Sequence, residues 1–394
     1  MAAVDRVVVI DDSPLLRAMI TQTLDALPGI SVIGQAGSGR EGLHQIQALD
    51  PDIVSLDIEL GDISGLEVLE QVMATQPRRV VVVSSQTEAG ADTTLRALAL
   101  GAVDFVPKGR LDPGPDGFEA HLARAFEAAR HARVLPARRS GAAAPPARQR
   151  PRSAEQRVAQ ARQRRAQAQS RMRGGGADRG GSAPTTSPPR PDPGLRKPEL
   201  LLIASSTGGP PALQEFFGTL TVAPAMPVVL VQHMPEAFTA RLASRLDQAG
   251  PASVSEAADG DELRRGHVHV ARGGRHLGID GRRLRLLDSA AIGGLKPRAD
   301  VTFEQAVAVH GSSLLAVVLT GMGDDGLIGC QAITRAGGQV LAQSGETSTV
   351  DGMPRKVRDA RLHLDEGSPA YLAALVDRLS GGRATMPADA GRRS

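Results

Sequence analysis

Five polar residues in the first 110 positions each end or follow a short apolar run: Asp11, Asp12, Asp57, Ser84 and Lys108. Short apolar runs bounded by turn-forming residues indicate buried strands. If these strands form one parallel sheet, their carboxyl ends line a single crevice, which is where ligands bind in such folds. The sequence therefore predicts that three carboxylates, a hydroxyl and a lysine converge at one edge.

These residue types suit phosphoryl transfer. Carboxylates bind Mg²⁺, which keeps several waters and takes phosphate oxygens readily. Asp57 would then attack phosphorus as a nucleophile, while Mg²⁺ and Lys108 offset the charge on the transferring group. The alternative is that each aspartate caps a helix or turn. That alternative explains any one aspartate, but not five such residues at successive strand ends.

A second group of candidates lies in the last 200 residues. The apolar run Leu200–Ala204 leads into S-S-T-G-G-P-P, Ser205 to Pro211, and then into helical spacing. A strand, a sharp turn and a helix N-terminus expose a serine hydroxyl where an anion is favoured, which suits a reaction through an oxyanion. A phosphate-binding turn explains the segment equally well. The residues alone do not separate Ser205 from Ser206.

A serine nucleophile needs a base and an orienting acid. His233 follows the run P-V-V-L-V-Q, so we expect it at the same sheet edge. The run Leu314–Leu319 precedes T-G-M-G-D-D-G, which offers Asp324 or Asp325. Triads are defined by geometry and not by chain order. The alternatives are a structural histidine, and a plain turn or divalent-metal site at the two aspartates.

The remaining histidines and the single cysteine are interpreted as structural. His267 and His269 face the same way on a predicted strand, but no third metal ligand stands at a suggestive spacing. Cys330 is the only cysteine, which excludes an internal disulfide and fits a reducing cytosol. We interpret it as a small buried thiol.

The elements that position these residues alternate along both halves of the chain. In the first 136 residues, runs at 7–10, 32–34, 53–56, 80–84 and 104–106 predict strands, with helices predicted at 14–27, 41–49, 66–74, 93–100 and 118–133. From Glu199, predicted strands at 200–204, 228–232, 267–271, 314–319 and 338–342 alternate with helices at 211–220, 303–309 and 329–336. The fold class is therefore α/β twice over: a doubly wound five-stranded domain and a second parallel-sheet domain.

The predicted organisation is a first domain at 1–136, a flexible linker at 137–198, a second domain at 199–380 and a disordered tail at 381–394. Residues 137–197 carry 15 basic and 3 acidic side chains, so the sequence pI near 9.5 arises in the linker.

Neither folded domain has the basic surface of a nucleic-acid binder, and aromatic residues form only 2% of the chain, which disfavours base stacking. With no apolar stretch of about 20 residues and no signal peptide pattern, we expect a cytoplasmic protein without membrane insertion.

Residues 1 to about 130 resemble the response-regulator receiver family. The resemblance implies that Asp57 is the phosphoacceptor and that Asp11 and Asp12 help it hold Mg²⁺. It also implies that Ser84 is the switch hydroxyl, Phe105 the switch aromatic and Lys108 the phosphate-contacting lysine. The chain departs from the family at Gly61 and Gly109, where proline is usual.

Residues 200 to about 378 resemble the catalytic domain of the chemotaxis protein-glutamate methylesterases, the CheB family. The resemblance rests on A-S-S-T-G-G, V-Q-H-M-P, L-T-G-M-G-D-D-G and G-M-P-R, in this order. It implies a nucleophile at Ser206, a base at His233 and an orienting acid at Asp325. The N–H of Met322 matches the proposed oxyanion donor, and Thr207 is a secondary site residue.

Three departures from this second family stand out. Ala204 replaces a common glycine, Asp351 replaces an apolar residue, and K-P-R at 296–298 replaces R-P-S. Lys296 keeps a positive charge but lacks the planar fork of arginine. The linker is also longer and more basic than is usual.

Together the two resemblances imply a phosphorylation-activated serine esterase. Its expected substrates are glutamate methyl esters on chemoreceptors, with methanol as product, and receptor glutamines by deamidation. A chemotaxis histidine kinase is the expected phosphodonor, with Mg²⁺ needed for phosphorylation and no cofactor for ester hydrolysis. The rival hypotheses are a receiver-linked transcription regulator, for which no helix-turn-helix is visible, and a binding protein on a degenerate hydrolase scaffold.

Overall fold

The structure is a computed structural model that describes residues 4–85, 87–108, 117–134 and 194–387. The described residues contain two parallel sheets, one before residue 135 and one after residue 193. We call the described residues before 135 the N-terminal domain and those after 193 the C-terminal domain. Most of the predicted linker, residues 137–198, and Gly109 lie outside the described residues.

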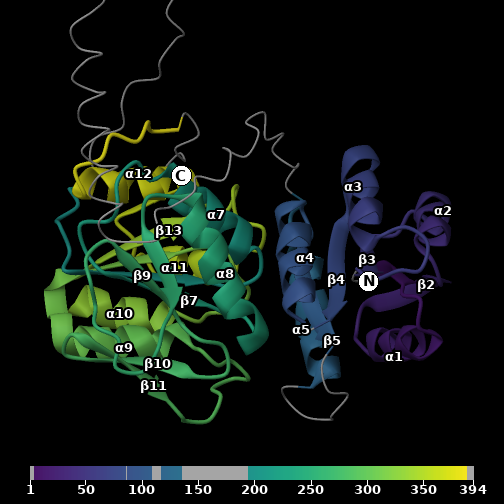
Figure 1. The fold of residues 1–394 in the computed structure, drawn as a ribbon, viewed down its shortest axis with the longest axis horizontal. Helices are drawn as coiled ribbons and strands as arrows, with labels where there is room; N and C mark the ends of the chain where they lie inside the picture. The colour runs from purple at the N-terminus through teal and green to yellow at the C-terminus, as the bar shows by residue number, and fades with distance from the viewer. Residues whose placement is uncertain (1–3, 86, 109–116, 135–193, 388–394) are drawn as a thin grey trace, which may run out of the picture. The chain divides into compact units, whose positions relative to one another are not determined.

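The N-terminal domain is a five-stranded parallel sheet in the order β2-β1-β3-β4-β5 (Figure 1). The strands are β1 (Asp5–Ile10), β2 (Ile30–Ala36), β3 (Ile53–Asp57), β4 (Arg79–Ser85) and β5 (Asp104–Lys108). Buried aliphatic side chains of α1 (Pro14–Asp25) and α5 (Phe118–His131) pack on one face of the sheet. The other face carries α2 (Gly39–Leu49), α3 (Gly65–Thr75) and α4 (Glu88–Ala99). The predicted doubly wound domain is confirmed.

Local sequence explains where these helices begin. The hydroxyl of Ser13 accepts a hydrogen bond from Leu16 N, and Pro14 follows as the first helical residue of α1. Ser64 and Glu67 form a reciprocal capping box at the start of α3. Capping side chains in the loops that follow β1 and β3 therefore fix where α1 and α3 begin.

The C-terminal domain has a seven-stranded parallel sheet in the order β14-β13-β12-β6-β7-β9-β8. The strands are β6 (Leu200–Ser205), β7 (Val228–Gln232), β8 (Ser253–Glu256), β9 (His267–Val270), β12 (Leu314–Val318), β13 (Gln339–Gln343) and β14 (Asp365–Gly367). An antiparallel hairpin, β10 (His276–Asp280) with β11 (Arg283–Leu287), adds a second small sheet. Strand β6 lies between β12 and β7, so their carboxyl ends meet.

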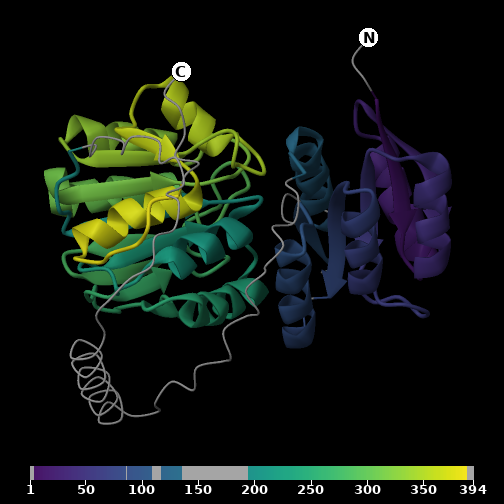
Figure 2. The ribbon, with the colours of Figure 1, turned by 90° about the horizontal axis from the view of Figure 1, so that it is seen from above.

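Helices cover both faces of this larger sheet (Figure 2). One face carries α7 (Gly209–Thr219), α8 (Glu236–Ala249) and α12 (Pro369–Leu379). The other carries α9 (Ala299–His310), α10 (Leu327–Arg335) and α11 (Met353–Asp359), together with the hairpin. The strands read as continuous apolar runs because both faces are covered. None of the helices in the described ranges is long and apolar enough to cross a membrane.

Backbone hydrogen bonds attach two flanking segments to the C-terminal domain. Before β6, Arg196 N donates to Gln339 Oε1 at 2.7 Å. After α12, Arg383 N donates to Thr221 Oγ1 and Ala384 N to Asp377 Oδ2. In both segments, backbone amides donate hydrogen bonds to polar side chains of the domain. Amino-acid composition alone does not predict such contacts.

Candidate active site and phosphoacceptor site

The three aspartates of the N-terminal domain lie together at the carboxyl end of its sheet. One carboxylate oxygen from each of Asp11, Asp12 and Asp57 lies within 4.8 Å of the others. Asp11 and Asp57 are buried, and Asp11 Oδ2 has no hydrogen-bond donor in the described structure. Because hard divalent cations prefer clustered oxygen ligands, these three residues fit a Mg²⁺ ion.

Lys108 reaches into this cluster from the end of β5. Its Nζ lies 2.5 Å from Asp57 Oδ2 and 3.3 Å from Asp11 Oδ2. Burial raises the pKa of Asp57 to about 6, although the hydrogen bonds from Lys108 and from the Glu59 amide lower it. Burial also opposes the charge of Lys108, but Asp57 and Asp11 raise the pKa of the ammonium overall. Asp57, the phosphoacceptor candidate, is thus a carboxylate in an ion pair with Lys108 whose pKa is still raised by burial.

The two predicted switch residues make their side-chain contacts with helices. The buried Ser84 hydroxyl accepts from Thr94 Oγ1 at 2.5 Å and contacts the carbonyl of Gly90. Phe105 is buried, and its ring centroid lies 4.6 Å from that of Phe238 in α8. Both side chains are therefore engaged by helices and not by the aspartate cluster.

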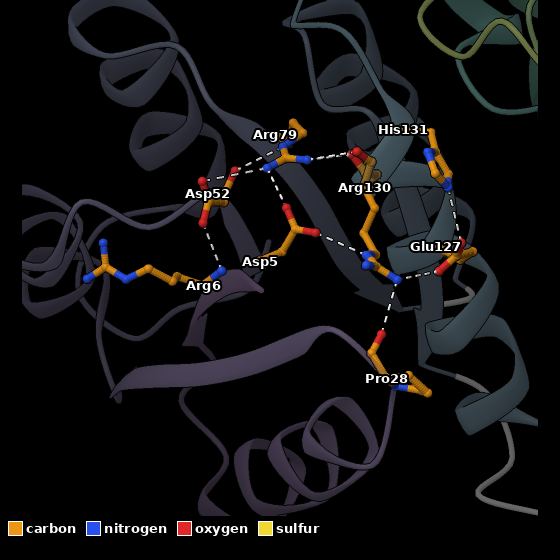
Figure 3. Close-up of polar contacts among 9 residues, drawn as sticks. Asp5, Arg6, Pro28, Asp52, Arg79, Glu127, Arg130 and His131 are labelled. Atoms are coloured by element: carbon orange, nitrogen blue, oxygen red, sulfur yellow. Dashed lines mark hydrogen bonds and ion pairs between the residues drawn. The ribbon is translucent and has the colours of Figure 1, made fainter. Parts of the chain in front are cut away.

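The opposite end of the same sheet is held by a network of charged side chains (Figure 3). Asp5 accepts from Arg79 at 2.8 Å and from Arg130 at 3.0 Å, so β1, β4 and α5 are joined. Arg79 also donates to the carbonyl of Arg130, and Arg130 to that of Pro28. Carboxylates at this end are matched by guanidinium groups, which suits a structural role.

In the C-terminal domain, geometry separates the two candidate serines. Ser205 is fully buried and its hydroxyl donates to Gln232 Oε1 at 2.6 Å. Ser206 follows the last residue of β6 and is half-buried. Its backbone is fixed, because Ser206 N donates to Thr320 O at 3.0 Å and Ser206 O accepts from Gly209 N at 2.7 Å. The Ser206 hydroxyl is thus the accessible one.

The glycine pair after the serines is needed for the sharp turn. Gly208 has φ of +76°, which side-chain-bearing residues adopt only with strain. A Cβ at Gly209 would lie 1.9 Å from Gln232 Oε1. The turn therefore brings Gln232 against the backbone, and Gln232 Nε2 in turn donates to Ser206 O at 2.9 Å.

His233 and Asp325 lie together beside this turn. His233 Nε2 is 2.7 Å from Asp325 Oδ2, and both side chains are buried. A carboxylate accepts only, so Nε2 carries the proton and Nδ1 is the basic nitrogen of the neutral ring. His233 N donates to Ser205 O, which places the ring next to the end of β6. Asp324, the alternative acid, is 66% exposed and makes no hydrogen bond to His233 in the described structure.

Asp325 is surrounded by donors. Its Oδ2 accepts from Ala299 N at 2.6 Å, and its Oδ1 accepts from Asp300 N and Gly326 N, both at 3.0 Å. Burial raises the pKa of this carboxyl, but the hydrogen bonds from His233 and from the amides at the start of α9 outweigh burial and lower it to about 2. Asp325 therefore stays ionised and holds the orientation of His233.

The loop between β12 and α10 packs directly on Ser206. A Cβ at Gly321 would lie 2.7 Å from Ser206 Cβ, so only glycine allows this approach. The N–H groups of Met322 and Thr207 donate no hydrogen bond within the described structure. Two free amides on either side of a serine are suited to binding an oxyanion.

The site is not closed for catalysis in this structure. Across the described residues, no hydrogen bond joins Ser206 Oγ to His233. The neighbouring hydroxyl of Thr207 donates to Asp104 Oδ2 at the start of β5. Burial raises the pKa of Asp104 to about 6, against the lowering effect of the Thr207 hydrogen bond. A residue of the N-terminal domain thus contacts the residue next to Ser206.

Other polar residues singled out in the sequence form no third centre. The rings of His267 and His269 lie 4.5 Å apart, and burial lowers the pKa of His269 to about 4. The described residues bring no third ligand close enough to the pair for a metal site. Cys330 is buried, and burial raises its pKa far above the usual range, which excludes a thiolate nucleophile.

Sequence reasoning gave no role in the site to three residues that shape it. Gln232 fixes both serines, while Asp300 and Arg298 flank Asp325. Arg298 Nε lies 3.3 Å from Asp325 Oδ1, and its Nη2 lies 3.1 Å from Asp300 Oδ2. Gln232 had a signal, because it immediately precedes His233, whereas Arg298 and Asp300 are near the site only through the packing of α9.

Comparison with known proteins places the chain in a family. The CheB methylesterase family model matches residues 201–376, and the response regulator receiver domain model matches residues 7–112. A protein-glutamate methylesterase/protein-glutamine glutaminase of Symbiobacterium thermophilum is 40% identical over 354 residues, covering 89% of this chain and 90% of that one. This chain belongs to the CheB methylesterase family.

A second relative also matches most of the chain. The protein-glutamate methylesterase/protein-glutamine glutaminase 1 of Oleidesulfovibrio alaskensis is 38% identical over 364 residues, covering 91% of this chain and 94% of that protein. The predicted architecture, a receiver domain joined to a hydrolase domain of the CheB family, is therefore confirmed.

The structure shows the surroundings of three residues that depart from the family patterns. Asp351 forms an ion pair with Arg358 at 2.6 Å, and Arg358 also pairs with Glu366 at 3.0 Å. Lys296 Nζ lies 3.8 Å from Asp288 Oδ1. At Gly61 a Cβ would meet nothing within 4 Å, so sterics do not require glycine there.

Proposed function

We propose that this chain hydrolyses glutamate methyl esters on chemoreceptors through Ser206, His233 and Asp325, and deamidates receptor glutamines by the same chemistry. The single observation that carries the proposal is the buried His233–Asp325 pair beside an accessible serine at the end of β6. The printed names of the relatives, protein-glutamate methylesterase/protein-glutamine glutaminase, support the two substrate types.

The proposed reaction has two halves. Ser206 Oγ attacks the ester carbonyl carbon while its proton passes to His233 Nδ1. The N–H groups of Met322 and Thr207 bind the resulting oxyanion. When the C–O bond breaks, His233 returns the proton to the leaving oxygen and methanol departs, leaving a glutamyl ester on Ser206.

Water completes the cycle. Deprotonated by His233, it attacks the glutamyl ester, and the second collapse releases a receptor glutamate and restores the Ser206 hydroxyl. A glutamine substrate follows the same course with ammonia as the leaving group. Asp325 stays ionised throughout and stabilises the protonated ring of His233.

The N-terminal domain is proposed to control access. Thr207 is tied to Asp104, and Phe105 packs against Phe238, so two consecutive residues of β5 engage the C-terminal domain near the serine. Phosphorylation of Asp57 by a histidine kinase would draw Lys108 and the end of β5 to the phosphoryl group. We expect the contacts of Asp104 and Phe105 to loosen and the open population to rise.

Mg²⁺ is the proposed cofactor of the phosphorylation step, held by Asp11, Asp12 and Asp57, where it would offset the charge of the incoming phosphoryl group. The ester hydrolysis described above uses only residues of this chain. The proposed location is the cytoplasm, where the chain would meet the histidine kinase and the signalling helices of the receptors.

The test is methanol release from methylated receptor membranes by the full chain, with and without a small-molecule acyl phosphate and Mg²⁺. We expect release in both cases and a marked increase with the phosphodonor. A chain that binds receptor but releases neither methanol nor ammonia would instead be a binding protein on a hydrolase scaffold.

A further inference from the structure

Arg298 lies between two buried carboxyl groups at the start of α9. It occupies the N-cap position, where its own side chain caps no amide. Its Nη2 is 3.1 Å from Asp300 Oδ2 and its Nε is 3.3 Å from Asp325 Oδ1. We propose that Arg298 is a positioning residue of the esterase, which keeps Asp300 and Asp325 ionised together so that Asp325 presents a full charge to His233. This inference rests on the proposed triad.

Two neighbouring buried carboxylates need such a cation. Asp300 and Asp325 are 4% and 2% exposed, so water does little to separate their charges. Backbone amides supply part of the compensation, since Asp300 Oδ1 accepts from Gly329 N at 2.9 Å. Burial, and next to it the charge of Asp325, raises the pKa of Asp300, while Arg298 lowers it. A guanidinium fork matches this geometry because one group meets two carboxylates at once.

The other charged groups around the pair do not replace Arg298. Asp324 lies 4.0 Å from Arg298 Nη2 and is largely in solvent. Lys296 pairs with Asp288, and burial lowers the pKa of His276 in β10, which disfavours a positive charge there. The Cys330 thiol of α10 stays neutral, because burial raises its pKa. Arg298 is thus the permanent cation that contacts both carboxylates.

Loss of the cation should appear in the pH dependence of catalysis. Without Arg298, one of the two carboxyl groups is protonated at a higher pH than in the wild type. As pH falls, the pair of neutral His233 and ionised Asp325 is therefore lost at a higher pH than in the wild type. We expect the acid limb of kcat/KM for the Arg298→Gln variant to move upward by about one pH unit. Arg298→Lys keeps the charge but not the fork, so its limb should lie between those of the two proteins.

The experiment measures kcat/KM for methanol release against pH in the phosphorylated full chain, for wild type, Arg298→Gln and Arg298→Lys. Arg358→Gln is the matched control, because Arg358 has the same 15% side-chain exposure and also pairs with two carboxylates. We expect Arg358→Gln to lower stability without moving the acid limb. A limb unchanged in Arg298→Gln, or moved equally in both glutamine variants, overturns the inference.

A second readout does not depend on catalysis. Arg298 stabilises ionised carboxylates, so the loss of thermal midpoint in Arg298→Gln should shrink as pH falls toward 3 and Asp300, the carboxyl with the raised pKa, becomes protonated. If the wild type releases no methanol at any pH, the proposed function has failed, and the thermal series still tests Arg298. A pH-independent loss of midpoint contradicts the inference, and if Arg298→Gln does not fold, Arg298→Lys carries both measurements.

Discussion

Asp57 in the N-terminal domain and Asp325 in the C-terminal domain are both buried at the carboxyl end of a parallel sheet, and their pKa values are shifted in opposite directions. Asp57 has a pKa raised to about 6, whereas Asp325 has a pKa lowered to about 2. The difference lies in the donors. Asp325 accepts from His233 and three backbone amides, but Asp57 accepts from Lys108 and the Glu59 amide, with Asp11 close by.

This difference corresponds to two chemical roles. A carboxylate that must attack phosphorus keeps lone pairs available and relies on a bound cation and lysine to neutralise it. A carboxylate that must orient a histidine is surrounded by fixed donors, which leaves it ionised and unreactive. The number of backbone amides that point at a buried aspartate thus differs between the proposed orienting acid, Asp325, and the proposed phosphoacceptor, Asp57.

The largest expected effect comes from removing the proposed nucleophile. Ser206→Ala should lower methanol release on the order of a millionfold, because a triad nucleophile is lost. Ser205→Ala is the control, since that hydroxyl is buried against Gln232 and should leave most of the turnover. Steady-state methanol release measures both. If Ser205→Ala is the inactive variant, the nucleophile has been assigned one residue too late.

The next effect tests the orienting acid. Asp325→Asn should reduce kcat by about ten-thousandfold, because the amide favours the wrong tautomer of His233. Asp324→Asn changes an exposed neighbour and should cost far less. Equal losses in the two variants would show that the short contact between Asp325 and His233 does not determine the role of either aspartate.

Release of the N-terminal domain should have a moderate effect. Deleting residues 1–193, and sparing 194–198 because they bind β13, should raise basal hydrolysis on the order of a hundredfold and abolish the response to a phosphodonor. A closed state favoured by about 2–3 kcal/mol is enough for this. In the full chain, Asp57→Ala should stay at the basal rate. A full unphosphorylated chain as active as the isolated domain would contradict control by access.

Sequence reasoning located the five strands and five helices of the N-terminal domain and the central strands of the C-terminal sheet, because apolar runs and helix caps are local signals. It also reached the residues at strand ends, which parallel topology brings together. It could not choose between Ser205 and Ser206 from the residues alone, because the choice depends on Gln232 and on which side chain is buried. It missed Arg298 and Asp300, since they approach Asp325 through the packing of α9 against α10. The β10–β11 hairpin, the edge strands β8 and β14, and the helices α8, α11 and α12 were also missed, because nothing in the pattern of the central strands requires them.

The smallest expected effect compares the two aspartates by stability. In the folded protein Asp57 titrates near pH 6, above the ordinary value of 3.8, so its ionised form opposes folding above pH 6 and this cost fades as pH falls toward 4. Asp57→Asn should therefore stabilise the metal-free full chain by about 1–2 kcal/mol at pH 7 and by less at pH 4.5.

The contribution of Asp325 to stability has the opposite sign, because its depressed pKa stabilises the fold above pH 4 and that stabilisation is lost only as pH falls toward 2. Asp325→Asn should destabilise by about 2–3 kcal/mol, by the same amount at pH 7 and pH 4.5. Calorimetric midpoints at the two pH values, with Asp324→Asn as the exposed control, measure all three. If Asp57→Asn loses stability at pH 7, or its gain does not shrink at pH 4.5, the Asp57 carboxyl is as well compensated as that of Asp325, and the contrast between the two buried aspartates does not hold.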